Sequence, residues 1–573
     1  AGDGITSLRA VRLTGTGEPG ATVSDGTVST IVANDGSYTL NNVAVAEGDS
    51  SLTLTFTDAA GNSAQTQIEI TGIAVTGGSP VLLWNQIACE GIADNGAIPP
   101  EASRVLAMQS VAVYDVIAVL DGSNPFMVAV DAPEGASIDA AIAAASHMVL
   151  KYAFPAFGAQ LDAYLAEALA GVTDAAARAA GVDLGRAVAG QIVTIRDADG
   201  WDDYEPFPGS EETGVWRETG PMYAIAALPQ WATMETWTLE SQSQFRVEAP
   251  PALESEEYAA MVNEVKELGD ADSTTRTADQ TEAARFWKDG RGTDSAAGHW
   301  NAIAAEYMDD AGLGVGGEAR ALAMLNVAVA DALIAAWDVK YTYALWRPED
   351  AIRLADEDGN PLTEADPDWT PLVISPNHPE YVSGHASISG AAAEMLTYLF
   401  GAQAFSTTSL GLPGVTRSFD SYWEAAEENA MGRVWSGVHF SLSGELGLGL
   451  GADVADWVIG AFNDATDTAA PTILVDAAVL YAGAGPVTLS GTVLDALSGV
   501  ASLAVAVNGG TAQALSFGTD GGFTFTLADP ADGAYSVAFS AMDAAGNLSQ
   551  VVTSRVAVDT TVSTAVVAGT TIS

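Results

Sequence analysis

Basic residues are scarce in this sequence, so the positions at which they gather are informative: 21 lysines and arginines face 74 acidic residues. Lys340 and Arg347 lie seven positions apart. Positions seven apart on one helix return to nearly the same face, so we expect both cations to project together from a helix that ends at Pro348. Two aligned cations favour a bound anion. Pairing with Glu349 and Asp350 is an equally good explanation of this cluster taken alone.

A second group of candidate residues combines a hydroxyl, free backbone N–H groups and an imidazole. Ser383, Gly384 and His385 follow a loop rich in proline and precede the mostly apolar run Ala386–Leu396. The first N–H groups of a helix have no partner inside the helix and favour an anion. A helix that begins at this point would therefore form an oxyanion cradle with a proton carrier beside it.

A third group consists of Arg433 and His439, which lie six positions apart. On one continuous helix their side chains would point in different directions. The intervening Ser436 and Gly437 predict a break instead, with one helix ending near Val434 and another beginning near His439. Such a break would turn both side chains toward a common site.

Together, the three groups resemble the signature shared by vanadium haloperoxidases and type 2 phosphatidic acid phosphatases. That signature reads K-x6-R-P, then P-S-G-H, then S-R-x5-H. The corresponding segments here are Lys340–Pro348, Val382–His385 and Gly432–His439, in the same order. Looser similarity to bacterial members covers most of residues 78–466.

The sequence departs from the family's pattern at three positions. Val382 replaces the usual Pro, and Gly432 replaces the usual Ser. Ser443 stands where the family often has an Asp, four residues after the last His. An Asp at that position would orient the imidazole of His439 and raise its basicity, whereas Ser brings no charge.

The resemblance implies a vanadate-dependent haloperoxidase, an enzyme that uses hydrogen peroxide to oxidise a halide to hypohalous acid for an unidentified organic acceptor. His439 would be the metal ligand, and His385 would be the general acid–base that takes a proton from peroxide. The implied catalytic residues are His378, Lys340, His385 and His439. The implied vanadate-binding residues are Lys340, Arg347, Ser383, Gly384, Arg433 and His439.

His378, seven residues before His385, is the best indicator of halide preference. Members of the family that resemble bromoperoxidases have His at this position, whereas fungal-type chloroperoxidases have Phe. The resemblance therefore implies that bromide and iodide are favoured. A loop histidine that caps a turn is the alternative interpretation.

Two other functions remain open at this point. An acid phosphatase on the same scaffold would use His439 as its nucleophile and hold phosphate with the same cations. The large size of the helical region and the absent Asp after His439 favour the haloperoxidase. An inactive adhesive or surface-layer protein is the third hypothesis, and the intact cationic set argues against it because unpaired buried cations are costly.

The elements that must position these residues form a helical region in the middle of the chain. Ala, Leu and Glu are dense there, and apolar residues recur at spacings of three and four, as on an amphipathic helix. The clearest expected helices are Pro99–Val119, Asp139–Phe154, Ala159–Ala170, Ala175–Asp197 and Gly317–Trp337.

The two ends of the chain share an internal repeat and predict β-structure. Asp58–Asn62 and Asp543–Asn547 have the same sequence, and each begins 23 residues after the Asp of an Asp-Gly pair, at Asp35 and Asp520. Alternating runs such as Ser51–Phe56 are typical of half-buried strands. We therefore expect a small immunoglobulin-like β-sandwich at each end.

The expected architecture is multidomain, with a central all-α helical-bundle catalytic domain and an all-β sandwich on each side. The predicted ranges are 1–77 and 467–560 for the sandwiches, 78–466 for the helical domain, and 561–573 for a linker or the start of a further module.

Composition excludes several classes of function. A net charge of −53 repels phosphate backbones and anionic lipids, which excludes nucleic acid and membrane surfaces as partners. Cys89 is the single cysteine, so there is neither a disulfide framework nor a multi-cysteine zinc site. The most apolar run, Ala321–Trp337, is broken by Asn326 and Asp331 and predicts a buried helix rather than a membrane span.

The acidic surface suits a salty or calcium-rich extracellular setting. Because the chain starts at Ala1, with neither an initiator Met nor a signal peptide, we expect a processed or truncated product. We expect the protein to be secreted or displayed at the cell surface. The acidic loop 197–203 is a candidate Ca²⁺ site, although it lacks the EF-hand spacing, and a solvated loop is the alternative. No oligomeric state is predicted.

Overall fold

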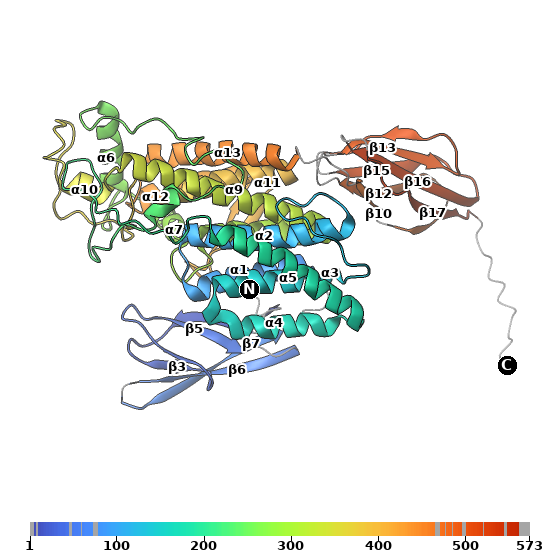
Figure 1. Ribbon diagram of the computed structural model, residues 1–573, viewed down its shortest axis with the longest axis horizontal. Coiled ribbons are helices and arrows are strands. Elements are labelled where there is room, and N and C mark those ends of the chain that lie inside the picture. Colours follow the sequence, from blue (N-terminus) through green and yellow to red (C-terminus); the bar gives the residue numbers. More distant parts are fainter. Residues whose placement is uncertain are drawn as a thin grey trace, which may run out of the picture. The chain divides into compact units, whose positions relative to one another are not determined.

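A computed structural model describes residues 5–6, 10–44, 48–58, 60–72, 78–463, 470–475, 477–483, 485–494, 500–518, 521–543 and 547–560. The chain forms two compact units, Ala1–Phe462 and Asn463–Ser573. Along the sequence, strands come first, helices follow and strands return near the end (Figure 1). The expected helical middle and β-structured ends are therefore confirmed. The predicted boundaries at 77/78 and 466/467 adjoin or lie in segments outside the described residues, so they stay predictions, as does the immunoglobulin-like nature of the ends.

The N-terminal strands form two sheets around one small core. The larger sheet has the order β1-β7-β6-β3-β4 and the smaller pairs β2 with β5. Val23 and Leu54 of the larger sheet share a buried cluster with Leu40 and Val43 of the smaller one. The bounds are β1 (Ile5–Thr6), β2 (Ala10–Thr16), β3 (Thr22–Ser24), β4 (Ser29–Ile31), β5 (Ser37–Ala44), β6 (Gly48–Thr57) and β7 (Ser63–Gly72).

The C-terminal unit also has two sheets, in the orders β10-β12-β15 and β11-β17-β16-β13-β14. Their core includes Phe523 from the first sheet and Phe539 from the second, with ring centres 5.1 Å apart. The predicted tail at 561–573 lies outside the described residues. The bounds are β10 (Thr472–Val475), β11 (Val479–Ala482), β12 (Val487–Leu494), β13 (Val500–Val507), β14 (Gln513–Leu515), β15 (Gly522–Leu527), β16 (Gly533–Asp543) and β17 (Val552–Val558).

The sequence repeated at the two ends forms the same side-chain bridge twice. The carboxylate of Asp58 accepts hydrogen bonds from the backbone N–H and the side-chain amide of Asn62, at 2.8 Å each. Asp543 accepts the same pair of bonds from Asn547, at 2.7 and 2.8 Å. Short polar side chains that bond to nearby backbone stabilise turns. The repeat therefore encodes a turn; Asp520 and residues 544–546 lie outside the described residues.

All of the expected helices are present in the helical region, as α2, α3, α4, α5 and α9. A short hairpin of β8 (Phe405–Thr408) and β9 (Thr416–Phe419) interrupts the helices. The helix bounds are α1 (Pro80–Asn95), α2 (Pro99–Asp121), α3 (Ile138–Ala153), η1 (Pro155–Phe157), α4 (Gly158–Gly171), α5 (Ala175–Asp197), η2 (Pro229–Ala232), α6 (Glu256–Leu268), α7 (Ala278–Phe286), α8 (Ser295–Ala311), α9 (Gly314–Tyr343), α10 (Pro348–Arg353), α11 (Gly384–Phe400), α12 (Tyr422–Trp435) and α13 (Ser441–Asn463).

Helix α9 lies in the core of the helical region, where it packs against α2 and α11. Every residue from Glu318 to Lys340 is buried. Asp331 is tolerated inside this helix because its carboxylate accepts hydrogen bonds from the backbone N–H groups of Trp237 and Thr238, at 2.7 and 2.8 Å. The prediction of a buried helix is therefore confirmed.

Among the described residues, α2 and α9 have the length and apolar composition of membrane spans. Their most apolar windows are, however, 94% and 100% buried inside the protein. A helix that is apolar on all sides is expected in the core of a large bundle. Both are accordingly core helices of this fold.

Glycine residues bring the backbones of α11 and α13 into close contact. A Cβ atom added to Gly390 would collide with the backbone of Leu448, and one added to Gly451 would collide with the carbonyl oxygen of Ser387. Only glycine permits such backbone approach. This packing fixes the start of α11, where the Ser-Gly-His sequence lies, against the start of α13.

Candidate anion-binding site

Lys340 and Arg347 come together, but they do not share a helix. Helix α9 ends at Tyr343 because Ala344 adopts a left-handed conformation, with φ of 49°. Arg347 precedes α10, and Pro348 is the first residue of that helix, a position that suits proline. The prediction of one helix ending at Pro348 is therefore wrong, since Pro348 starts a helix and a turn brings the two cations together.

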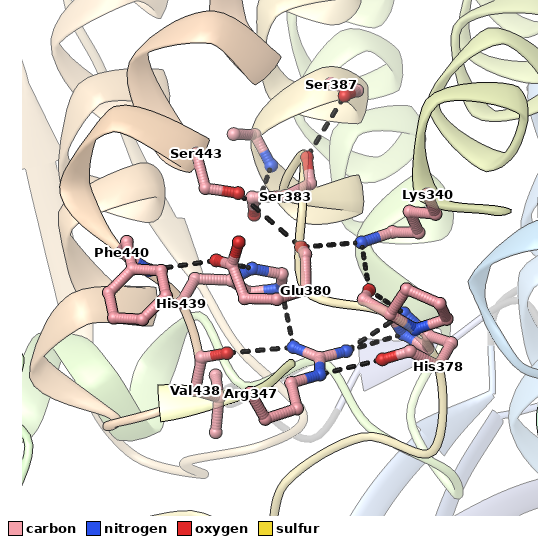
Figure 2. Close-up of polar contacts among 12 residues, drawn as sticks. Lys340, Arg347, His378, Glu380, Ser383, Ser387, Val438, His439, Phe440 and Ser443 are labelled. Atoms are coloured by element: carbon pink, nitrogen blue, oxygen red, sulfur yellow. Dashed lines mark hydrogen bonds and ion pairs between the residues drawn. The ribbon is translucent and has the colours of Figure 1, made fainter. Parts of the chain in front are cut away.

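Lys340 is completely buried and is held by backbone oxygens. Its Nζ donates hydrogen bonds to the carbonyl oxygens of Pro379 and Glu380, at 2.9 and 3.0 Å (Figure 2). The ammonium also lies 5.7 Å from the centre of the Trp337 ring. Burial, followed by the charge of Arg347, holds the pKa of Lys340 well below its usual range. An anion would relieve both effects.

Arg347 is also completely buried, and its guanidinium joins two loops. Nε donates to the carbonyl oxygen of His378 and Nη1 to that of Val438, both at 2.8 Å. Nη1 also lies 3.2 Å from Nε2 of His439 (Figure 2). Burial lowers the pKa of Arg347 to about 9. The arginine therefore connects the loop before α11 with the loop before α13.

Arg433 is the cation with the least satisfied hydrogen-bonding groups. It lies in the last turn of α12 and is 3% exposed. Its Nε and Nη1 have no hydrogen-bond partner among the described residues. Burial lowers its pKa to about 10, although Asp289 opposes that effect. A buried donor left unpaired costs about 1–3 kcal/mol, so these two N–H groups fit an oxyanion.

The predicted helix break between Arg433 and His439 is present. Helix α12 ends at Trp435, Gly437 has a φ of 77°, and α13 begins at Ser441, slightly later than expected. Glycine is required at position 437 because a Cβ there would collide with the backbone oxygen of Gly269. Arg433 and His439 both line one cavity as a result.

A residue that the sequence analysis missed, Glu380, completes the surroundings of His439. Its Oε1 lies 2.9 Å from Nδ1 of the imidazole and also accepts the backbone N–H of Phe440 at 2.9 Å (Figure 2). The side chain of Ser443, at the family's Asp position, donates to the carbonyl oxygen of Glu380 at 3.5 Å and interacts with Glu380 rather than with the imidazole. The carboxylate expected after His439 is thus supplied from the loop before α11. Its position in that loop, beside the Ser-Gly-His segment, was the available signal.

Burial governs the protonation of this acid and its partner. Burial raises the pKa of Glu380 to about 7, although Lys340 and the N–H of Phe440 oppose the rise. Burial, and then the charge of Arg347, hold the pKa of His439 well below its usual range. The imidazole is therefore neutral at neutral pH, with a lone pair available on one ring nitrogen.

The Ser-Gly-His segment starts a helix, as predicted. Ser383 is the N-cap of α11, and its Oγ accepts the backbone N–H of Ala386 at 3.3 Å. Gly384 packs closely on Trp337, since an added Cβ would lie 3.1 Å from that ring. Nε2 of His385 lies 3.3 Å from the carbonyl oxygen of Lys288, and the ring is half-buried.

The predicted site residues divide into a cavity wall and a layer behind it. The cavity has a volume of about 180 Å³, and its wall includes His378, Gly384, His385, Arg433 and His439. Lys340, Arg347 and Ser383 are buried and adjoin the wall through the contacts above. The exposed side chains of Lys288 and Arg291 and the apolar Ile98 and Ile374 also line the cavity. Cations, imidazoles and backbone N–H groups around one small cavity can bind a tetrahedral anion.

The described residues contain no group of three or more His, Cys, Asp or Glu side chains placed to hold a metal ion. Asp199, in the acidic loop 197–203, forms ion pairs with Arg104 and Arg196, each at 2.9 Å. The calcium hypothesis for this loop gains no support from its geometry.

Comparison with known proteins gives consistent similarities. Residues 320–468 match the family model of the VCPO second helical-bundle domain. Vanadium chloroperoxidase from Curvularia inaequalis is 28% identical in an alignment over 170 residues; the match covers 21% of this chain and 27% of that protein. The chain thus aligns with about a quarter of the length of that relative.

Two crystal structures resemble the helical region more fully. A bacterial vanadium-dependent iodoperoxidase is 25% identical, with a TM-score of 0.60 over 67% of this chain and 97% of that chain. A bacterial vanadium-dependent chloroperoxidase in its holo form is 20% identical, with a TM-score of 0.50 over 63% of this chain and 92% of that chain. The second likeness concerns the fold alone.

Proposed function

Because the helical region belongs to the vanadium haloperoxidase superfamily, we propose that this chain is a vanadate-dependent haloperoxidase. It would use hydrogen peroxide to oxidise a halide, with bromide and iodide preferred, to hypohalous acid. The observation that carries the proposal is Arg433, a buried cation with two unpaired N–H groups in the wall of the cavity that also holds His439.

The donors around the cavity fit vanadate. His439 would hold the vanadium through Nε2, because Nδ1 is engaged by Glu380. Arg433, Lys340 and Arg347 would neutralise the oxygens, with the hydroxyl of Ser383 and the N–H of Gly384 as further donors. When bound, vanadate supplies a Lewis-acidic vanadium(V) centre that makes peroxide electrophilic.

His385 is the proposed proton carrier. Its Nε2 is directed to the carbonyl oxygen of Lys288, which can only accept a hydrogen bond, so Nε2 carries the proton and Nδ1 is free to take one. Burial, followed by the charge of Arg433, holds the pKa of His385 well below its usual range. The ring is therefore a neutral base at neutral pH, ready to accept a proton from peroxide.

The same residues could also be considered for an acid phosphatase, with His439 as the nucleophile. The absent Asp after His439 no longer argues against a nucleophilic imidazole, because Glu380 provides a carboxylate. Similarity to haloperoxidases, and the His378 ring in the cavity wall, support halide oxidation instead. The assembled cationic site supports an enzyme over a purely adhesive protein.

The test is peroxide-dependent bromination by the full-length apoprotein, with and without added orthovanadate. We expect activity only with vanadate, and we expect phosphate to suppress it by competing for the same donors. Hydrolysis of an aryl phosphate, assayed in parallel, should be negligible. Bromination that is indifferent to vanadate, or efficient phosphate hydrolysis, would overturn the proposal.

A further inference from the structure

We propose that Glu380 is a positioning residue that fixes the tautomer of His439, so that Nε2 presents its lone pair to the cavity. The inference rests on the proposed function only for the identity of the group that Nε2 meets. It assigns to Glu380 the part that the family's pattern places at position 443.

The two hydrogen-bond partners of the imidazole determine its tautomer. Nδ1 lies 2.9 Å from Glu380 Oε1, and Nε2 lies 3.2 Å from Arg347 Nη1 (Figure 2). A guanidinium can only donate, so Nε2 must be the accepting nitrogen of a neutral ring. Nδ1 must then carry the proton, and it donates a hydrogen bond to Oε1.

Glu380 accepts the hydrogen bond from Nδ1 whether its own carboxyl group is ionised or protonated. Oε1 already accepts the backbone N–H of Phe440 at 2.9 Å, so it acts as an acceptor toward both groups. Oε2 has no partner among the described residues and is the place for any proton on the acid. The hydrogen bond to His439 is therefore preserved in both forms of the carboxyl group.

The backbone of Glu380 is held as firmly as its side chain. Its N–H donates to the carbonyl oxygen of Leu345 at 2.9 Å, and its own carbonyl accepts Nζ of Lys340 at 3.0 Å. The residue is completely buried. One residue thus sets the orientation of the imidazole and the position of a neighbouring cation, whereas Ser443 contacts neither.

Histidine-selective ¹⁵N NMR of the full-length apoprotein tests the tautomer directly. The chain has five histidines, and His439→Gln would identify the signal of interest. We expect the proton on Nδ1 of His439 in the wild type. A proton on Nε2 would overturn the proposal, without any variant at 380 and whether or not vanadate binds.

Calorimetric titration with orthovanadate tests the consequence for binding. Partners that orient a metal-bound histidine typically contribute 10- to 100-fold to affinity. We expect Glu380→Gln, which keeps an acceptor but loses charge, to weaken binding about 10-fold and to retain the tautomer. Glu380→Leu should weaken binding roughly 100-fold, because Nδ1 of the imidazole loses the acceptor that orients the ring.

The matched control is Ser443→Ala, which removes the side chain at the family's Asp position and should leave affinity within about twofold, since that side chain does not touch the imidazole. Thermal melting establishes that each variant is folded; if Glu380→Leu is not, Glu380→Gln and the wild-type spectrum decide. Wild-type affinity in folded Glu380→Gln and Glu380→Leu would refute the assignment. A wild type that binds no vanadate would refute the proposed function and leave the tautomer result standing.

Discussion

Nη2 of Arg347 lies 2.9 Å from Nδ1 of His378. The imidazole in the cavity wall is therefore bonded directly to one of the cations that would hold vanadate. Its ring also packs on Trp337, with centres 4.9 Å apart. A residue at position 378 that cannot accept this hydrogen bond should make the cavity wall less polar and release Nη2 of Arg347.

We predict that His378→Phe raises chloride oxidation relative to bromide oxidation. Phenylalanine cannot accept the Arg347 hydrogen bond, so the guanidinium would be freer to act on the anion, and the local dielectric would fall. Steady-state rates with chloride, bromide and iodide for both proteins are the measurement. His378→Gln, which keeps a polar acceptor, is the control and should retain the wild-type order. A wild type that oxidises chloride as readily as bromide would remove the basis for this prediction.

His385→Ala and His439→Ala should fail in different ways. Loss of the proton carrier should leave vanadate binding nearly unchanged and lower turnover about 10²- to 10⁴-fold. Loss of His439 should abolish vanadate binding itself. Titration with vanadate, followed by peroxide-dependent bromination at saturating vanadate, separates the two. Equal losses of affinity would show that the roles are misassigned.

Arg433→Met should stabilise the apoprotein while weakening its affinity for anions. The free energy of unfolding should rise by about 1–3 kcal/mol, because two unpaired buried donors are removed. Arg276→Met is the control: its Nη1 donates to the carbonyl oxygens of Leu268 and Asp270, so its loss should destabilise the protein. Denaturant unfolding with and without phosphate measures both effects. Destabilisation of the apoprotein by Arg433→Met would contradict the view that the buried N–H groups of Arg433 are unpaired until an anion binds.

Lys288 and Arg291 should accelerate the entry of anions into a protein that repels them. Both line the cavity and are exposed, in a chain with a net charge of −53. The double variant Lys288→Gln/Arg291→Gln should slow phosphate association with the apoprotein roughly tenfold at low ionic strength. The difference should shrink as salt is added. Arg186→Gln/Arg555→Gln changes the net charge equally at exposed positions outside the cavity, and equal slowing in that variant would argue against local steering.

Anion binding should take up protons at pH values below the usual histidine pKa of about 6.5. The pKa values of His378, His385 and His439 are held below their usual range, first by burial and then by neighbouring cations. A bound anion raises these pKa values, so protons are taken up and the affinity increases as the pH falls. Sulfate is a suitable probe because its charge is constant in this range. Titrations in buffers of different ionisation enthalpy should give different heats; identical heats would contradict the prediction.

Short sequence patterns predicted where helices begin and end better than they predicted the turns between helices. The helix start at Ser383 and the break at Gly437 follow from capping and glycine chemistry, which act within a few residues. The turn between Lys340 and Arg347 could not be predicted in this way, because it depends on a left-handed conformation of Ala344. Alanine is the strongest helix former, so only tertiary contacts account for that turn.

The Glu380–His439 pair was beyond sequence reasoning for a different reason. The two residues are 59 positions apart, and spacing rules describe only neighbours on one element. The family pattern directed attention to position 443, which is only four residues after His439. In the folded chain, the packing of α11 on α13 brings a carboxylate from another segment. The secreted location and the organic acceptor stay predictions.

The cations of this site are anchored mainly to main-chain oxygens: Arg347 to those of His378 and Val438, and Lys340 to those of Pro379 and Glu380. A carbonyl group survives any substitution of its own side chain. The wall at residue 378 can therefore mutate while most of the electrostatic framework behind it persists. In the proposed enzyme, halide selectivity and cofactor retention would thus be separable traits, and selection could tune the former without first losing the latter.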